Sequence, residues 1–351
     1  MKNIFDLVRP QNIVAYYDSK KADQTTYMGE MLFPTRKIVG LELTKIGGRA
    51  GLPVTLKASA FDTQPTFRDR LSIEQSKERL PFFREAMKID ETTRQQIVSV
   101  SNDALLGAYI ERIFDDANNL IRGARAQRER MAMELISTGH VKLEGNGVKM
   151  DYNYNLNKNQ KVASSWANPA TSKPLQDIID WVDAFRTKFY VNLGYAVMNT
   201  KTFNLIKASD SVKHALYPTA TSATSLFVTS PQVKDLIQTA TGITVLINDA
   251  AYATTVGGAA KPFFPDNTIS FLPVGGVLGN MVFGTTPEEI DLMTNASYAG
   301  DVRIVDTGVA VNTQTIAVPV NVITTVSQIV LPSFTNDVEG GAGAILIADV
   351  K

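Results

Sequence analysis

Side chains capable of acid–base, nucleophilic or metal chemistry are few in this sequence. It contains two histidines, His140 and His214, and no cysteine. Neither histidine has a carboxylate or a second histidine at the spacing that a metal site requires. The missing cysteine excludes disulfide bonds, thiolate ligands and a cysteine nucleophile. We therefore expect both histidines to be structural or solvated.

Two pairs of adjacent carboxylates, Asp115-Asp116 and Glu288-Glu289, are the remaining candidates for acid–base work. Neighbouring side chains point apart on a regular element, so neither pair suits a dyad that shares a proton, and both are expected on solvated faces. Four glycine clusters lack the residues of a phosphate-binding loop and predict turns: 47–51, 257–258, 275–276 and 339–343. We expect no catalytic residue, no cofactor and no metal, and hence no enzyme.

The composition is that of a globular protein, with 44% hydrophobic and 20% charged residues among 351. This length suggests one large or two intertwined units. Lys+Arg and Asp+Glu both number 35, which argues against a protein whose main role is tight polyanion binding. Nine acidic and two basic residues lie from Asp266 to Lys351, so the preceding part carries a matching positive excess. This asymmetry is either chance or a means of pairing head to tail between copies.

Neither a signal peptide nor a membrane span is apparent. Lys2, Asp6 and Arg9 interrupt the N-terminal segment, where a signal peptide would be apolar. No apolar run reaches the roughly 18 residues of a transmembrane helix. We expect synthesis and function in a cytoplasm, without a membrane partner.

The first 95 residues predict little core of their own. Residues 1–35 lack a sustained period and are expected to form an extended arm. Residues 36–46 and 54–60 predict two strands around a glycine-rich turn. Residues 61–91 mix charged and aromatic side chains, which is typical of a projecting loop that packs on a neighbour.

The most regular pattern predicts a long helix over residues 101–138. Its apolar positions repeat at helical spacing: Leu106, Ile110, Ile113, Ala117, Leu120, Ala124, Met131 and Leu135. A charged outer face is expected at Glu111, Arg112, Asp115, Asp116, Arg122, Arg125, Arg128, Glu129 and Arg130. The period follows 3.6 better than strict heptads, so a coiled-coil dimer is disfavoured.

The remainder predicts a mixture of helices and strands, so the fold class is α+β. A hairpin is expected at 140–154, with Asn146-Gly147 in its tight turn. Helices are predicted at 174–190, 200–208 and 230–239, and loops at 209–229 and 250–260. Strands are predicted at 195–198, 244–247, 268–273 and 280–284, with several more between 303 and 331.

Residues 264–271 (FPDNTISF), Gly279 and residues 283–289 (FGTTPEE) resemble the late signature of lambda-type major capsid proteins, the major capsid protein E family. These are the shell subunits of tailed bacteriophages and have the Hong Kong 97 fold. Supporting positions are Trp166, residues 174–178 (PLQDI), residues 196–199 (AVMN), Phe203 and Lys207. The order of elements is also similar, and the likeness covers nearly the whole chain.

The resemblance implies a division of the chain and a set of partners. The implied parts are an N-terminal arm (1–35), an extended β-loop with flanking strands (36–95), a peripheral domain (96–173) with its spine helix (101–138) and hairpin (140–154), an axial domain (174–290), and closing strands shared by both domains (291–351). Hexamers and pentamers of the subunit would form an icosahedral shell, assembled in the bacterial cytoplasm, around double-stranded DNA held by weak non-specific contacts. The short arm implies a separate scaffolding protein, and a portal, protease and decoration protein are further partners of such shells.

Contacts between subunits are expected from the projecting loop. Aromatic anchors are Phe67, Phe82 and Phe83, while Arg68, Arg70 and Arg84 would give oriented polar contacts. We expect Arg68 and Arg70 to pair with acidic residues of an adjacent subunit. Two rival hypotheses remain: an encapsulin-like nanocompartment shell, and a soluble hydrolase or binding module with a pocket near His214.

Overall fold

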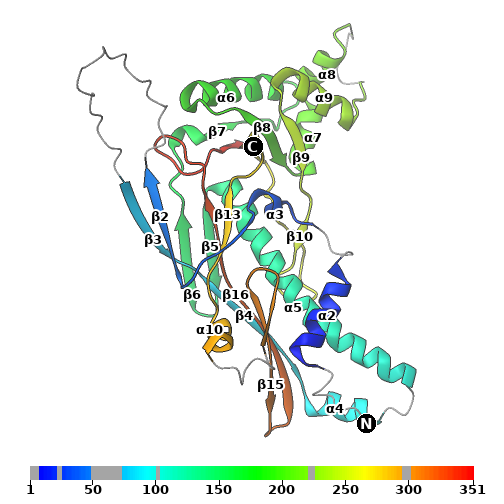
Figure 1. Cartoon of the computed structure of the whole chain (residues 1–351). Coiled ribbons are helices and arrows are strands. Elements are labelled where there is room, and N and C mark those ends of the chain that lie inside the picture. Colours follow the sequence, from blue (N-terminus) through cyan, green and yellow to red (C-terminus); the bar gives the residue numbers. More distant parts are fainter. Residues whose placement is uncertain (1–7, 22–25, 49–72, 100–102, 220–225, 295–301) are drawn as a thin grey trace, which may run out of the picture. The chain divides into compact units, whose positions relative to one another are not determined.

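The computed structural model describes residues 8–21, 26–48, 73–99, 103–219, 226–294 and 302–351. The chain forms two compact units, each built from discontinuous segments. The first unit contains residues 1–43, 78–131 and 280–333; the second contains residues 44–77, 132–279 and 334–351. The chain contains both helices and strands, each often in consecutive runs, as Figure 1 shows, so the α+β prediction is confirmed.

A mixed sheet forms the centre of the first unit. Its order is β1 (Thr35–Lys37), β13 (Gly279–Phe283), β16 (Asn321–Phe334), β15 (Val309–Ile316) and β14 (Val302–Val305), and β4 (Phe82–Ile89) also pairs with β16. Both β15 and β4 run antiparallel to β16. Because β16 has neighbours on both edges and is buried along most of its length, it is the central strand of this sheet.

Two helices cover the β14–β16 part of this sheet with their apolar faces. Helix α5 (Asp103–Thr138) confirms the predicted spine helix. Its Ala117 and Ile121 pack in one cluster with Ile13 and Tyr17 of α2 (Pro10–Ser19) and with residues of β14, β15 and β16. The shorter helices of this unit are α3 (Met28–Leu32), α4 (Glu91–Ser99) and α10 (Pro287–Thr294).

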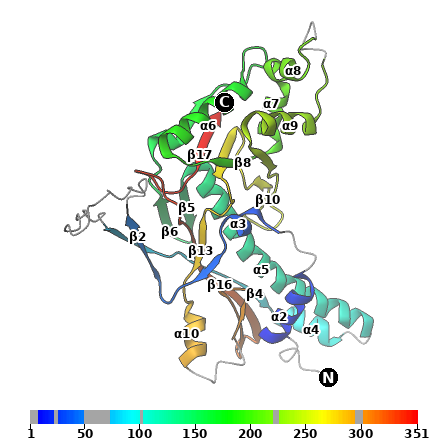
Figure 2. The same ribbon diagram turned by 45° about the horizontal axis from the view of Figure 1, so that its top comes forward.

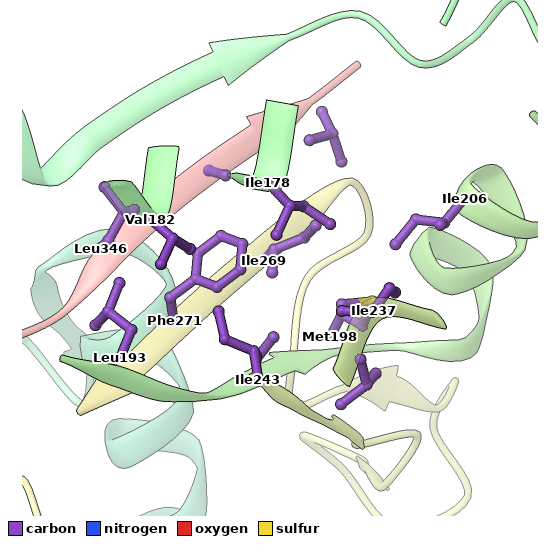
Figure 3. Packing of buried hydrophobic residues seen from close by; sticks show 14 of the residues in the cluster. Ile178, Val182, Leu193, Met198, Ile206, Ile237, Ile243, Ile269, Phe271 and Leu346 are labelled. Carbon is purple, nitrogen blue, oxygen red and sulfur yellow. The ribbon is translucent and has the colours of Figure 1, made fainter. Parts of the chain in front are cut away.

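The second unit has a five-stranded sheet with helices packed against it. The strand order is β7 (Lys161–Ser164), β17 (Leu346–Val350), β12 (Thr268–Pro273), β8 (Leu193–Met198) and β9 (Thr244–Ile247). The helices are α6 (Pro174–Phe189), α7 (Thr200–Ala208), α8 (Asp210–Leu216) and α9 (Ser230–Thr241). Figure 3 shows Ile178 and Val182 of α6 packed over Phe271 of β12 and Leu346 of β17.

Turns in the second unit follow the predicted glycine positions. The hairpin of β5 (His140–Gly145) and β6 (Val148–Asn153) is confirmed, with positive φ at Asn146 and Gly147 as its tight turn requires. Gly139 also has a positive φ, and its N–H donates to the carbonyl of Leu135 at the end of α5. A Cβ at Gly139 would lie 2.5 Å from Leu156 Cδ1, so the position requires glycine for space as well as conformation. The unit also contains the 3₁₀ turn Lys158–Gln160 and the short pair β10 (Ala251–Tyr252) and β11 (Lys261–Pro262).

The expectation of an extended N-terminal arm is wrong for the described part. Residues Pro10–Ser19 are helical, and the side chains of Ile13 and Tyr17 are fully buried within the same unit. Pro10 does not break this helix, because proline suits the first helical position, where no N–H donor is needed.

The projecting loop and two further loops also need correction. Residues 82–89 of the predicted loop 61–91 form β4 within the sheet of the first unit. Residues 42–48 form β2 (Glu42–Gly48), which pairs with β3 (Ile73–Arg79); the predicted strand at 54–60 lies outside the described residues. Helix α8 begins inside the predicted loop 209–229, and β10 lies inside 250–260. The division into arm, extended loop, peripheral domain and axial domain stays a prediction.

Candidate assembly surface

The six predicted contact residues divide into two groups. Phe67, Arg68 and Arg70 lie outside the described residues. Phe82, Phe83 and Arg84 begin β4, where they stand opposite Ile329, Gln328 and Ser327 of β16. Side chains alternate between the faces of a strand, so Phe82 and Arg84 share one face and Phe83 points to the other.

Phe82 and Arg84 form a unit on the outer face of β4. The Phe82 side chain is 44% exposed, which is high for a large apolar residue. The guanidinium carbon of Arg84 lies 4.7 Å from the centroid of the Phe82 ring. Arg84 also donates to Glu288 Oε1 at 2.5 Å, so part of its charge is used within its own subunit.

Glu288 and Glu289 are not solvated, contrary to the sequence prediction. Their exposed fractions are 7% and 8%. Glu289 Oε2 accepts from Lys37 Nζ at 2.5 Å, and Lys37 also donates to the carbonyl of Gly284. The two acids therefore attach α10 to β1 through Lys37 and to β4 through Arg84.

Helix α10 was not predicted, although the sequence carries its start signal. The N–H of Thr286 donates to Glu289 Oε2, and the N–H of Glu289 donates to Thr286 Oγ1, both at 3.3 Å. This reciprocal pair of hydrogen bonds is a capping box. Pro287 stands at the first helical position. The Thr-x-x-Glu spacing followed by an apolar residue could therefore have predicted this helix.

Five exposed apolar residues lie on segments that are joined around α10. They are Val39, Leu41, Phe82, Ile290 and Met293, and we call them the α10 surface. The segments are held together because Thr285 N donates to Gly40 O and Leu80 N donates to Leu41 O. Figure 2 shows α10 close to the turn that precedes β2. Val39 and Met293 are 96% and 74% exposed, so both apolar side chains meet water in the single subunit.

The structure also places the two histidines and the adjacent acids Asp115 and Asp116. His140 Nδ1 lies 3.3 Å from Asp151 Oδ1 across the β5–β6 hairpin, a partner that the sequence did not reveal, and His214 is exposed on α8. Asp115 and Asp116 are exposed, as predicted. Among the residues that the structure describes, no three His, Cys, Asp or Glu side chains are grouped so that they could hold a metal ion. Across the same residues, every helix is too short or too polar to cross a bilayer.

Two solved structures share the fold of this chain. One, described as a capsid protein of a prophage of Escherichia coli CFT073, has a TM-score of 0.60 and 12% identity, and the match covers 98% of this chain and 99% of that chain. A phage-related protein of Bordetella bronchiseptica RB50 has a TM-score of 0.53 and 11% identity, with coverage of 95% and 96%. The fold is that of Hong Kong 97-like capsid proteins, as the resemblance implied.

The family follows from the sequence itself. Residues 11–310 match the family of phage major capsid protein E, and the chain therefore belongs to it. The protein is a structural capsid protein, and this match supports the phage capsid hypothesis over the nanocompartment. No curated protein sequence matches the chain.

Proposed function

We propose that this protein is the major head subunit of a tailed phage, and that its hexamers and pentamers close an icosahedral shell around double-stranded DNA. The family match over residues 11–310 carries the proposal. A shell subunit needs surfaces that are buried only against other copies. The α10 surface meets this need, since Val39 and Met293 remain exposed in the single subunit.

Electron microscopy and light scattering of the purified chain test this function. The expected result is closed particles, or capsomers that close when a scaffolding protein from the same phage is added. A stable monomer under both conditions would contradict shell formation and would favour the soluble binding module. Particles that enclose an enzyme instead of DNA would identify a nanocompartment.

We further propose that the shell assembles in the bacterial cytoplasm with a separate scaffolding protein and a portal, and that the chain itself catalyses no reaction. A protease, a decoration protein and weakly held DNA complete the proposed set of partners. Co-expression with the neighbouring phage genes, followed by mass spectrometry of purified particles, identifies which of them are present. Particles that form normally without any partner would remove the scaffold from this proposal.

The predicted contacts of Arg68 and Arg70 remain part of this proposal. We expect reversal of both charges, R68E and R70E together, to reduce particle yield, because like charges would then face the acidic residues of a neighbour. Unchanged yield and unchanged thermal stability of the particles would show that these residues do not form the pairing. The exposed pair Lys149 and Glu144 offers a control, since K149E changes charge on the β5–β6 hairpin instead.

A further inference from the structure

The first unit contains a cavity of about 420 Å³ beside α2 and α5. Its lining includes Tyr17 and Lys21 near the end of α2, Arg125 and Arg128 of α5, and Asp306 in the turn between β14 and β15. This volume lies within the range of small-ligand sites, roughly 300–1,000 Å³. None of the residues that line the cavity belongs to the α10 surface.

Most charges around the cavity are matched by close partners. Arg125 donates from Nε and Nη2 to the two carboxylate oxygens of Glu30, both at 2.9 Å. Asp306 accepts from Lys21 Nζ at 2.8 Å and from the Tyr17 hydroxyl at 3.2 Å. Glu30 and Asp306 therefore each have a close cation. The third carboxylate of the lining, the buried Glu129, accepts from the N–H of Gly29 through Oε2 at 2.7 Å.

Among the cations of the cavity, Arg128 has the most distant carboxylate partner, and it is also the most deeply buried. Its side chain is 7% exposed, and its nearest carboxylate oxygen, Asp306 Oδ2, is 3.9 Å away. Within the described part of the chain its Nε is buried without a hydrogen-bond partner. The sequence had placed Arg128 on a solvated outer face, so the structure overturns that expectation.

The position of Arg128 is energetically unfavourable as it stands. A buried guanidinium has five N–H donors, and leaving a buried charge poorly paired is strongly destabilising. The ring of Phe283, 5.4 Å from the guanidinium carbon, compensates only in part. Burial lowers the pKa of Arg128, which agrees with an incompletely compensated charge.

We propose that the Arg128 cavity binds a small oxyanion, a phosphate or a carboxylate, whose oxygens accept hydrogen bonds from the Arg128 guanidinium. The planar guanidinium can bind either group with two parallel hydrogen bonds. The bound anion would lie between α2 and α5 and hold the two helices together. This inference goes beyond shell formation and does not depend on it.

Thermal unfolding of the full chain tests the site, with inorganic phosphate and acetate as probes and chloride at equal ionic strength as reference. At a probe concentration near 100 times its dissociation constant, we expect an increase in Tm of roughly 5 °C. Isothermal calorimetry then gives the affinity of each probe. Tighter binding of phosphate indicates a free phosphate or phosphoryl ligand, and tighter binding of acetate indicates a carboxylate.

Variant R128M should lose this increase, and its Tm in chloride should equal or exceed that of the unchanged protein, because a poorly paired buried charge has been removed. R122M, which removes an exposed arginine of the same helix, should keep the increase. An increase that persists in R128M would mean an adventitious ion only, and no increase in the unchanged protein would also overturn the proposal. A large fall in Tm for R128M in chloride would show that Arg128 is already compensated.

Discussion

Charged residues of this chain often pair over long sequence separations, and this limited what could be predicted for single residues. The partners of Glu288 and Glu289 lie 204 and 252 positions away, at Arg84 and Lys37. Adjacent acids were assigned to a solvated face because local spacing carries no information on such partners. The same limit applies to Arg128, whose burial depends on segments far from α5 in sequence.

Removal of Lys37 should destabilise the first unit. In K37M, Glu289 stays buried without its cation, and we expect a loss of about 1–3 kcal/mol in the free energy of unfolding. Chemical denaturation measures this change. The control is K149M, which breaks the exposed Lys149–Glu144 pair and should cost less than about 1 kcal/mol. Equal losses in the two variants would show that the burial of Glu289 has no energetic consequence.

Asp306 should make the stability of the first unit depend on pH. Burial by itself would raise the pKa of Asp306, but hydrogen bonding and charge from Lys21, with Arg128 and Tyr17, hold the pKa below its ordinary value of 3.8. The stabilisation is therefore complete above about pH 5 and is lost as the pH falls through the lower folded pKa. Urea unfolding at a series of pH values should show a smaller acid-induced loss in D306N than in the unchanged chain. Asparagine tolerates the positive φ of this position, so the variant keeps the turn. An identical loss in both proteins would exclude Asp306 as the group responsible, and D291N serves as an exposed control.

Elements with a long or regular pattern were predicted well, and short ones were not. The spine helix, the β5–β6 hairpin and helix α7 are confirmed, since periodicity and turn residues specify them locally. Helix α2 was missed because two apolar side chains, Ile13 and Tyr17, make most of its buried face. Strand β4 was missed because its pairing with β16 joins residues more than 200 positions apart.

The docking of α2 is testable through its buried isoleucine. In I13A the side chain that packs with Ala117 and Ile121 is truncated, and we expect a loss of about 2–5 kcal/mol in the stability of the first unit. Limited proteolysis should then cut the N-terminal segment sooner. Q11A, on the exposed side of the same helix, should behave like the unchanged chain. Unaltered proteolysis of I13A would mean that α2 does not depend on this contact.

At the scale of the molecule, the resemblance predicted the fold and the family correctly, whereas periodicity alone reached only the α+β class. Local sequence patterns could not predict that the two units are discontinuous. Each unit combines segments from the beginning, middle and end of the chain. The α10 surface could not be predicted for the same reason, since loop 38–41, β4 and α10 meet only after folding.

A charged residue in the α10 surface should block assembly without unfolding the subunit. Met293 is 74% exposed, so M293E changes little in the isolated chain but places a charge in the expected interface. We expect circular dichroism and Tm to be unchanged and particle yield to fall at least tenfold, as measured by sedimentation. M293L retains the apolar surface and should assemble normally. Full assembly of M293E would show that this part of the surface faces solvent in the shell.

The strand orders also constrain when a newly made chain can fold. Strand β16 (321–334) is central to one sheet, and β17 (346–350) lies between β7 and β12 in the other. A ribosome delivers residues in sequence, so neither sheet is complete until these late strands have left the exit tunnel. Chains that are still being translated on one messenger RNA consequently lack finished cores. Assembly-competent subunits therefore arise only after the last strands of each chain have been made.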